Sequence, residues 1–277
     1  MKLVAEAGAT KIQWGIVQDN NVYEFITSGF NPNVSDRNYL RQLLVSGFPG
    51  NFSSSDIVEI QYYGAGCGND KNKNEVKRAL VNFFTNVKNV EIYSDLEAAG
   101  KAIFKNESGF VGVLGTGSSF GYYDEGQIIK QAPSLGYLLG DEGSGAHMGK
   151  ELITKLLHNE LTKDLEKLFY EKYSTNSQQL IKDLYQSKTP SAFLANFSMF
   201  LKDHTRDTLL NSIILESLVS FVERYILPMV KGKDDIAIGF VGGVAYAFKP
   251  EINLILVQNK LTSPIIIQKP FEHLVKL

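Results

Sequence analysis

The chain contains two similar stretches, residues 2–27 and 110–132, and each combines three extended runs with two tight turns. In the first, KLVAEAG, IQWGIVQ and VYEFIT are separated by turns at residues 7–10 and 19–21. In the second, FVGVL ends in a Gly-Thr-Gly loop, and a turn at residues 124–126 separates SFGYYD from QIIKQA. Short apolar runs bounded by Gly, Asn and Asp predict strands. The repeated order indicates an internal duplication, although two unrelated hairpins could also look alike.

Helices and strands alternate after the first stretch. Residues 74–87 have apolar spacing near 3.6, which predicts an amphipathic helix. The other elements that we expect before the second stretch are helices at 36–45 and 96–104 and strands at 57–66 and 90–95. This order is typical of a mixed sheet covered by helices, so we expect an α/β fold.

The part after the second stretch is rich in helix. We expect helical segments within 145–173, 189–204, 208–232 and 251–261, and strands at 235–243 and 264–268. A chain of 277 residues is near the upper limit for one core. We therefore expect two domains, 1–106 and 107–277, with the last few residues able to pack back on the first.

The charge and composition argue against several classes of partner. The formal net charge is −2, which gives no electrostatic reason to expect nucleic acid or an anionic membrane as a partner. Glu6 interrupts the N-terminal run before a signal-like segment can form, and the apolar residues 236–248 are too few to span a bilayer. The single cysteine, Cys67, excludes an internal disulfide framework and favours a reducing compartment. We expect a cytoplasmic protein.

Several common catalytic motifs are absent from the sequence. No Gly-Lys pair is followed by Ser or Thr, so there is no Walker A loop. Phe120 stands where a G-x-G-x-x-G motif starting at Gly115 would have its third glycine. The four histidines are too scattered for a local zinc motif, and no G-x-S-x-G elbow is present.

Two glycine-hydroxyl turns remain as candidates for binding an anion. They are residues 8–11, with Gly8, Thr10 and Lys11, and residues 115–118, with Gly115, Thr116, Gly117 and Ser118. Such a turn can direct backbone N–H groups and a hydroxyl at one anion. Either turn alone is equally well an ordinary β-hairpin turn, but two such turns in a duplicated frame favour one ligand held from both sides.

Asp95 ends the strand YSD just before a helix of small residues. In isolation, such a residue is most often a helix N-cap. The functional alternative is a carboxylate that accepts a hydroxyl proton as the hydroxyl attacks phosphorus.

Two further glycine-rich segments can each be explained either by local structure or by contact with a ligand. In SLGYLLGDEGSGA, residues 134–146, three glycines surround Asp141 and Glu142 before a long helix, which suggests close approach of the backbone to a ligand. Gly242 and Gly243 follow a strand and precede a helix, where a nucleotide can rest on bare backbone. A simple strand-to-helix turn explains this pair equally well.

Taken in order, these elements resemble the actin/hexokinase superfamily, and most closely its N-acetylglucosamine kinase branch within the BadF/BadG/BcrA/BcrD-type ATPases. The resemblance covers essentially the whole chain, and LGTGS followed by LGYLLGDEGSGA is its specific part. It implies ribonuclease-H-like folds in both halves, with ATP, Mg²⁺ and a sugar substrate in an interdomain cleft. Closure of that cleft would exclude water and favour transfer over ATP hydrolysis.

The resemblance also implies a role for each candidate residue. Asp95 matches the base that activates the sugar hydroxyl, and Glu6 matches the acid that organises Mg²⁺. The remaining correspondences are phosphate loops at Gly8–Lys11 and Gly115–Ser118, adenosine contacts at Gly242 and Gly243, and sugar contacts at Asn31, Ser134, Leu135, Gly136 and Asp141. Main-chain amides, Thr116, the opposing loop and Mg²⁺ would hold the phosphate charge that a Walker lysine holds elsewhere.

The chain departs from the family pattern at three positions. Glu6 replaces the usual Asp and is one methylene longer, which matters because Mg²⁺ is strict about geometry. Gln13 stands where relatives often have a second acid, and Ser94 stands where another small polar residue is common.

Three functions compete on these residues, and a kinase for another sugar or another small acceptor is a further alternative. The first is an ATP-dependent kinase for the 6-hydroxyl of an N-acetylated hexosamine, most simply N-acetylglucosamine. The second is an ATPase that activates a dehydratase or reductase, but its bridging [4Fe–4S] cluster would need more cysteines than Cys67 alone. The third is a non-catalytic sugar or nucleotide sensor, favoured by Glu6 and Gln13. The apolar residues 213–230 fit a homodimer interface and a core helix equally well.

Overall fold

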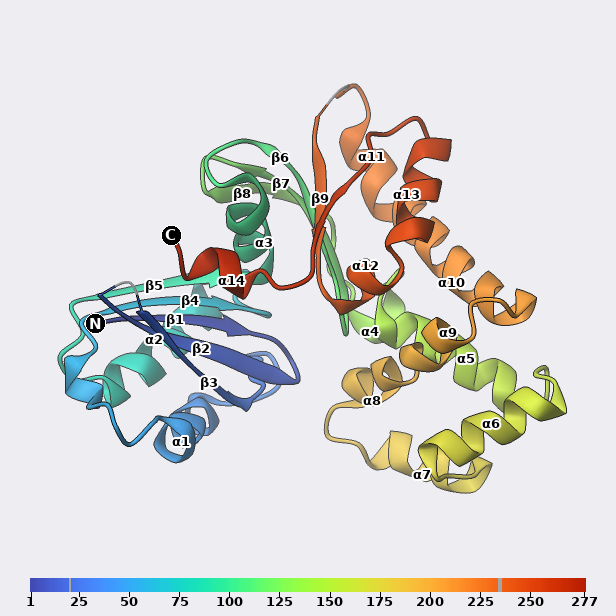
Figure 1. Cartoon of the computed structure of the whole chain (residues 1–277), viewed down its shortest axis with the longest axis horizontal. Coiled ribbons are helices and arrows are strands. Elements are labelled where there is room, and N and C mark those ends of the chain that lie inside the picture. Colours follow the sequence, from blue (N-terminus) through green and yellow to red (C-terminus); the bar gives the residue numbers. More distant parts are fainter. Residues whose placement is uncertain (20, 234–235) are drawn as a thin grey trace. The chain divides into compact units, whose positions relative to one another are not determined.

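The computed structural model of the chain describes residues 1–19, 21–233 and 236–277. These residues form two five-stranded sheets, in the strand orders β3-β2-β1-β4-β5 and β10-β9-β6-β7-β8 (Figure 1). The chain divides into two compact units. Unit 1 comprises residues 1–108, 123–128 and 269–277, and unit 2 comprises residues 109–122 and 129–268. The expected α/β class, with mixed sheets flanked by helices, is confirmed.

The first sheet belongs to unit 1. Its strands are β1 (Lys2–Ala7), β2 (Lys11–Gln18), β3 (Asn21–Ser28), β4 (Glu59–Gly64) and β5 (Asn89–Ser94). The helices of this unit are α1 (Arg37–Gly47), α2 (Asp70–Phe83), α3 (Asp95–Phe104) and α14 (Phe271–Leu274).

The second sheet comprises β6 (Gly109–Leu114), β7 (Ser118–Asp124), β8 (Gln127–Gln131), β9 (Ile238–Val241) and β10 (Ile265–Ile267). The tip of the β7–β8 hairpin is assigned to unit 1, and the rest of this sheet to unit 2. The helices of unit 2 are α4 (Gly136–Leu139), α5 (Gly145–Leu157), α6 (Lys163–Tyr173), α7 (Ser177–Gln186), α8 (Pro190–Asn196), α9 (Ser198–Asp203), α10 (Thr208–Phe221), α11 (Leu227–Val230), α12 (Gly243–Ala247) and α13 (Lys249–Gln258).

The two sheets have the same topology when β6–β10 are matched in order to β1–β5. In each, the first strand lies between the second and the fourth, and the fifth lies beside the fourth. The pairs β1–β4 and β4–β5 are parallel, as are β6–β9 and β9–β10. The repeat in the sequence therefore corresponds to a repeated arrangement of strands.

Alternation along the strands places apolar side chains on both faces of the unit 1 sheet. Leu3, Ala5 and Trp14 are fully buried in a cluster on the face that α1 and α2 cover, whereas Val4 and Tyr63 face α3 and α14 (Figure 1). The sheet is thus a central layer with a core on each side.

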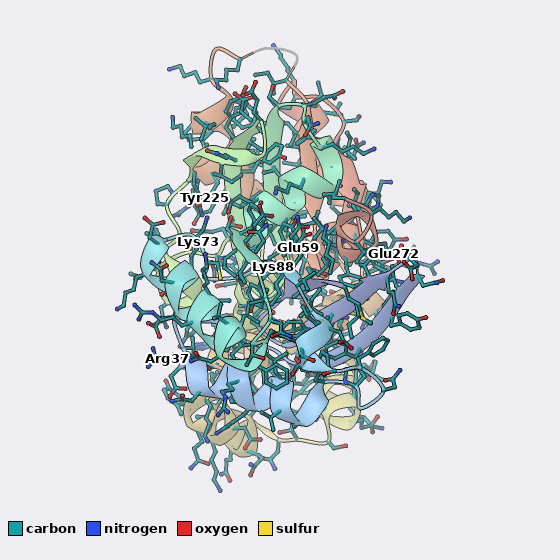
Figure 2. The ribbon with its side chains drawn as sticks, turned by 90° about the vertical axis from the view of Figure 1, so that its left-hand side faces the viewer. Arg37, Glu59, Lys73, Lys88, Tyr225 and Glu272 are labelled. Atoms are coloured by element: carbon teal, nitrogen blue, oxygen red, sulfur yellow. The ribbon has the colours of Figure 1, made fainter. Side chains whose placement is uncertain are left out.

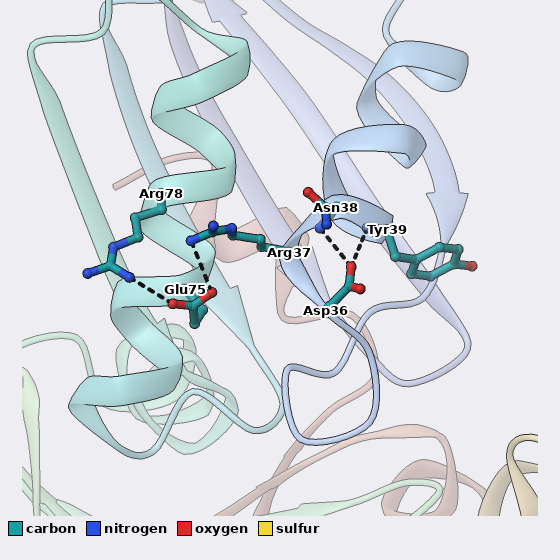
Figure 3. A network of polar contacts seen from close by, with 6 residues as sticks. All are labelled: Asp36, Arg37, Asn38, Tyr39, Glu75 and Arg78. Atoms are coloured by element: carbon teal, nitrogen blue, oxygen red, sulfur yellow. Dashed lines mark hydrogen bonds and ion pairs between the residues drawn. The ribbon is translucent and has the colours of Figure 1, made fainter.

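Polar contacts also join the two helices on the first face. Asp36 caps α1, because its Oδ1 accepts the N–H groups of Asn38 and Tyr39 at 2.8 and 3.1 Å (Figure 3). Glu75 on α2 lies between Arg37 at 3.6 Å and Arg78 at 3.0 Å (Figure 3). The Arg37–Glu75 pair joins α1 to α2, whereas Arg78 and Glu75 are both on α2; an exposed ion pair contributes only about 0–1 kcal/mol to stability.

The helical part of unit 2 differs in detail from the sequence expectation. The expected helix 145–173 is two helices, because Asn159 adopts a left-handed φ of 57° and Thr162 begins α6 as its N-cap. The segment 208–232 contains α10, a π-helical turn at Val222–Ile226 and α11. Since Ile213, Ile214 and Leu218 on α10 are almost fully buried, α10 is a core helix. Helix α7 was not anticipated.

Two expected elements include residues outside the described ranges. They are the turn at Asp19-Asn20-Asn21, which includes Asn20, and the strand at 235–243, which includes Asp235; the described strand here is β9. Within the ranges that the structure describes, none of the helices combines the length and the hydropathy that a membrane span requires.

Candidate active site

The carboxyl ends of three parallel strands meet at one edge of the unit 1 sheet. Ala7 of β1 pairs with Gly64 of β4, and Gly64 pairs with Ser94 of β5. Glu6 precedes Ala7 in β1 and Asp95 follows Ser94 as the first residue of α3, so these two acids lie at the same edge of the sheet.

The first predicted phosphate loop is a tight turn at this edge. The N–H of Gly8 donates to the carbonyl of Lys11 at 2.9 Å, and the N–H of Gly29 donates to the carbonyl of Thr10 at 3.0 Å. A Cβ at Gly29 would overlap the carbonyl of Ala9, so only glycine lets the end of β3 approach this closely. Thr10 and Lys11 are exposed, which leaves their side chains free to meet a ligand.

Helix α3 is capped by Ser94 and not by Asp95. Oγ of Ser94 accepts the N–H of Glu97 at 3.1 Å, and the Glu97 carboxylate accepts the N–H of Ser94 at 2.6 Å, which completes a capping box. The interpretation of Asp95 as an N-cap is therefore wrong. Asp95 is the first helical residue, and its Oδ1 accepts the N–H of Leu96 at 3.0 Å. The Ser-x-x-Glu spacing in SDLE was the sequence signal for this cap.

Burial makes both acids at this edge harder to ionise. Desolvation raises the pKa of Asp95 to about 6, against the opposing effect of a hydrogen bond from the N–H of Leu96. Burial also raises the pKa of Glu6; the positive charge of Lys11 partly offsets this, and the Asp95 charge adds to it. A carboxylate with a pKa near 6 is suited to accept a proton close to neutral pH.

Lys73 on α2, labelled in Figure 2, forms an ion pair with Glu97 in the first turn of α3. Its Nζ lies 3.3 Å from Oε2 of Glu97, the same oxygen that accepts the N–H of Ser94. The ion pair therefore ties α2 to the capping box beside Asp95. Nothing in the sequence reasoning had marked Lys73.

The Asn31 side chain contacts the loop after β4, and this loop begins at the same edge of the sheet. Gly66 in that loop has φ 79°, and a Cβ there would overlap Oδ1 of Asn31. The N–H of Phe30 donates to the carbonyl of Gly8 at 3.2 Å, which joins this segment to the first phosphate loop. Cys67 in the same loop is buried, and burial with the nearby Asp95 charge raises the pKa of its thiol to about 12. The structure thus gathers Glu6, the Gly8–Lys11 turn, Asn31 and Asp95 within unit 1.

The second predicted phosphate loop lies in unit 2 against the start of α5. The carbonyls of Gly115 and Thr116 accept the N–H groups of Gly145 and Ala146 at 2.9 and 3.1 Å. Among the residues that the structure describes, no protein acceptor is found for the backbone N–H groups of Thr116 and Gly117. The loop therefore has its carbonyls engaged and two amides available for an anion.

Asp141 lies directly against this second loop. Its Oδ1 is 3.5 Å from the N–H nitrogen of Ser118, and a Cβ at Gly117 would come within 3.0 Å of Oδ2. Asp141 is buried and has a left-handed φ of 57°. Burial raises the pKa of its carboxyl.

The other predicted sugar contacts in this segment, Ser134, Leu135 and Gly136, are less enclosed than Asp141. Ser134 and Leu135 are exposed and Gly136 is partly buried with φ 70°. A Cβ at Gly140 would come within 2.9 Å of the Leu135 Cβ, so the chain turns back at α4 to reach Asp141.

Glu142 is an internal anchor rather than a second ligand-facing acid. It forms an ion pair with Arg224 at 3.1 Å and accepts a hydrogen bond from Tyr225 at 2.6 Å (Figure 2 labels Tyr225). Both partners lie in the π-helical turn, a feature frequent near functional sites.

The glycines around Asp141 and Glu142 also have partners within the protein. Gly143 has φ 76°, its N–H donates to Oγ of Ser217 at 3.0 Å, and a Cβ there would press on Phe221 at 2.8 Å. Nδ1 of His147 contacts the same Ser217 hydroxyl at 2.8 Å. Close packing within unit 2 therefore explains Gly143 without a ligand, and close approach of a ligand to this segment stays a prediction.

Gly242 lies on the end of β6 beside the second loop. Its φ is 115°, and a Cβ there would overlap the carbonyl of Leu114 and approach the N–H of Gly115 at 3.4 Å. In contrast, a Cβ at Gly243 would meet open space. The two glycines therefore have different roles, which the sequence alone did not distinguish.

These features define a class of protein: two sheets of one ribonuclease-H-like topology, each with a glycine turn after its first strand, as in actin/hexokinase-like ATPases. Comparison with known structures agrees. A protein from Porphyromonas gingivalis, described as a "Putative N-acetylglucosamine Kinase", is 30% identical, with a TM-score of 0.92 over 100% of this chain and 98% of that one. The chain belongs to the actin/hexokinase-like ATPase superfamily, in the same family as that protein.

More distant structures share the fold alone. A second "Putative N-acetylglucosamine Kinase", from Chromobacterium violaceum, is 14% identical with a TM-score of 0.72, over 99% of this chain and 97% of that one. A glucokinase of the ROK family from Streptomyces griseus, solved with glucose and AMPPNP, is 12% identical with a TM-score of 0.53, over 96% and 93%. No protein-family model and no curated protein matches the sequence.

Proposed function

We propose that the protein is an ATP-dependent sugar kinase that transfers phosphate to the 6-hydroxyl of an N-acetylated hexosamine, most simply N-acetylglucosamine, in the cytoplasm. We also assign it to the BadF/BadG/BcrA/BcrD-type ATPases. The proposal rests on the environment of Asp95. The pKa of its carboxyl is raised to about 6, and its side chain does not cap α3, because Ser94 is the N-cap. The description of the 30% identical relative supports the sugar class.

In the proposed reaction Asp95 is the general base. Its carboxylate accepts the proton of the sugar 6-hydroxyl while that oxygen forms a bond to the γ-phosphorus of ATP. The bond between this phosphorus and the β,γ-bridging oxygen breaks, and ADP leaves. The free N–H groups of Thr116 and Gly117 would stabilise the charge on the phosphate oxygens. Gly8–Lys11 would contribute a second set of phosphate contacts, and Gly242 and Gly243 would contact the adenosine.

We propose that Mg²⁺ binds at the unit 1 edge. The described residues contain no cluster of three or more His, Cys, Asp or Glu side chains that could hold a metal, so water and phosphate oxygens would supply most of its ligands. Burial and the charge of Asp95 both raise the pKa of Glu6, and a divalent cation would favour its ionised form. Glu6 would hold the ion, which would supply positive charge to the phosphates when bound. Gln13 cannot share this role as an acid, and its amide donates to Glu24 at 2.8 Å.

The Mg²⁺ assignment predicts that Glu6→Gln weakens metal binding. Loss of the charged ligand should raise the Kd for Mn²⁺, a paramagnetic substitute for Mg²⁺, by about 10-fold or more. Electron paramagnetic resonance titration of the protein with AMPPNP measures this without turnover. Glu6→Asp keeps the charge and should bind the metal at least as tightly as the native chain. Equal affinity in the native and Glu6→Gln proteins would contradict the assignment.

The overall proposal is tested by assaying the protein with ATP and Mg²⁺ against N-acetylglucosamine, N-acetylmannosamine, glucosamine and glucose. ADP and N-acetylglucosamine 6-phosphate should form in equal amounts. ADP without sugar phosphate would indicate an ATPase or another acceptor. If no product forms while sugar still raises the melting temperature, a non-catalytic sugar sensor is favoured, and Glu6 in place of Asp is the observation behind it.

Asn31 provides a test of the acceptor side. Its Oδ1 accepts the backbone N–H of Asn33 at 2.9 Å, so its Nδ2 group is the part left to donate to a sugar. Asn31→Asp keeps the shape and replaces that donor with a charged acceptor. We expect the KM for the sugar to rise about 10–100-fold, with the KM for ATP nearly unchanged. A rise in both constants would contradict a sugar-specific role.

A further inference from the structure

A buried asparagine on α2 joins the two loops at the candidate acceptor site. Asn72 is 7% exposed, and its Nδ2 donates two hydrogen bonds, to the carbonyl of Gly66 and to Oδ1 of Asn33, both at 2.7 Å. Gly66 lies in the loop after β4, and Asn33 lies in the loop after β3 that also carries Asn31. One side chain therefore ties both loops to the first turn of α2.

The hydrogen-bond pattern fixes the direction of every amide in this cluster. A backbone carbonyl can only accept, so the atom of Asn72 that faces Gly66 must be Nδ2. The atom of Asn33 that faces Nδ2 of Asn72 must then be Oδ1. The backbone N–H of Asn33 can only donate, so the atom of Asn31 that faces it must be Oδ1. Each side chain thus has one orientation, set from the backbone.

The Asn31 side chain also lies against the backbone of Gly66. A Cβ on Gly66 would overlap its Oδ1, so the Asn31 amide rests directly on the Gly66 backbone. The two anchors of the Asn31 side chain are therefore the Asn33 N–H and the Gly66 backbone. Asn72 bonds to the same two residues, and its own first-turn N–H is held by Oδ1 of Asn69, the N-cap of α2.

We propose that Asn72 is a positioning residue for the sugar acceptor: it fixes Asn33 and Gly66, and through them it directs the Nδ2 group of Asn31 at the sugar. This rests on the proposed function of the site. Asn72 does not itself contact the sugar. Its loss should therefore weaken sugar binding through disorder of Asn31, and nucleotide binding should not change.

The test compares three variants of the full chain. Asn72→Ala removes both donors, Asn33→Ala removes one acceptor at an exposed position, and Asn74→Ala is the matched control on the exposed side of α2. Calorimetry measures binding of N-acetylglucosamine and, separately, of AMPPNP. We expect the sugar Kd to rise about 10-fold in Asn72→Ala and about 3-fold or more in Asn33→Ala. Asn74→Ala should match the native chain, and AMPPNP should bind all four proteins equally.

A second readout works without any sugar. Cys67 is the single cysteine, and it is buried. It follows Gly66 directly in the loop after β4, to which Asn72 is hydrogen-bonded. Loss of the two Asn72 hydrogen bonds should increase the rate at which Cys67 reacts with Ellman's reagent about 10-fold or more in Asn72→Ala. Asn74→Ala should leave this rate unchanged. If Asn72→Ala does not fold, Asn33→Ala provides both readouts.

The outcomes separate this proposal from the function it rests on. If the native chain binds no sugar of the panel, the proposed function fails, and the Cys67 rate still decides whether Asn72 holds the loop. If the native chain binds the sugar and both Asn72→Ala and Asn33→Ala bind it equally well, Asn72 is not a positioning residue. An equal loss of sugar and AMPPNP affinity would also overturn the proposal, because that pattern indicates general destabilisation.

Discussion

Replacing Asp95 with Asn should reduce phosphoryl transfer by about 10²–10⁴-fold, the usual contribution of a general base. The amide has the same shape as the carboxyl but cannot accept the hydroxyl proton. The backbone should not move, because Ser94 and Glu97 cap α3 without Asp95. Binding of ATP should therefore be nearly intact. Steady-state measurement of ADP and sugar phosphate, with calorimetry for AMPPNP, gives both quantities.

The native enzyme should also lose activity in acid through the same residue. With a pKa of about 6, Asp95 is mostly ionised at pH 7 and mostly protonated at pH 5. Only the ionised form can accept the proton, so kcat/KM should fall about 10-fold per pH unit below pH 6. An acid limb near pH 4, the region of an ordinary Asp, would contradict the role of desolvation at this site.

Replacing Asp95 with Asn should also make the folded protein more stable at neutral pH. The pKa of Asp95 is raised from 3.8 in the unfolded reference to about 6, so the folded state binds the proton more tightly. Proton binding to Asp95 therefore stabilises the folded state fully below pH 3.8, and this stabilisation is lost as the pH rises through 6. At pH 7 the ionised Asp95 carboxylate is destabilising. We expect Asp95→Asn to gain about 1–3 kcal/mol at pH 7 and little at pH 4.

Asp70 offers a matched control, because it is the first residue of α2 as Asp95 is the first residue of α3. Asp70 is exposed, and Asn69 caps its helix. Asp70→Asn should leave turnover unchanged and should lower stability slightly, since an acid near a helix N-terminus is mildly favourable. If Asp95→Asn keeps its turnover, or if both variants change stability alike at pH 7, Asp95 is not the desolvated base.

The repeated three-strand unit could be predicted because it depends on local patterns. Period-two alternation and turn residues are visible within a few positions, and they gave strands near β1–β3 and β6–β8. The acid at the end of β5 and the two glycine turns were visible for the same reason. The cap of α3 was assigned to the wrong residue because Ser94 and Asp95 are both good N-caps, although the Ser-x-x-Glu spacing favoured Ser94. The choice depended on Glu97, whose carboxylate returns to Ser94.

The features that sequence reasoning missed depend on contacts between distant segments. Asn72 is 39 residues from its partner Asn33, and no local pattern marks a buried asparagine on a polar helix. Glu142 was assigned no role of its own, because its partner Tyr225 lies 83 residues away along the chain. Sequence reasoning uses only neighbouring residues along the chain. The roles of the glycines and acids depend instead on the residues that contact them in the folded protein.

Gly242 illustrates that difference and gives the second large prediction. Its φ of 115° and ψ of 162° are accessible to glycine almost alone, and a methyl group there would overlap the Leu114 carbonyl at the end of β6. Gly242→Ala should therefore cost about 3 kcal/mol or more, which for a unit of this size lowers the melting temperature by about 6–12 °C. Because Leu114 leads into Gly115, we also expect the Kd for AMPPNP to rise about 10-fold or more.

Gly243→Ala separates the two effects. A Cβ at Gly243 meets open space and Gly243 begins α12, so the methyl group should leave the melting temperature unchanged or slightly higher. If Gly243 contacts the adenosine, the same methyl group should still weaken AMPPNP binding. Differential scanning calorimetry without ligand and calorimetric titration with AMPPNP distinguish these cases. Equal melting temperatures for the two variants would show that Gly242 does not set the packing of the second phosphate loop, and unchanged AMPPNP affinity in Gly243→Ala would remove Gly243 from the adenosine site.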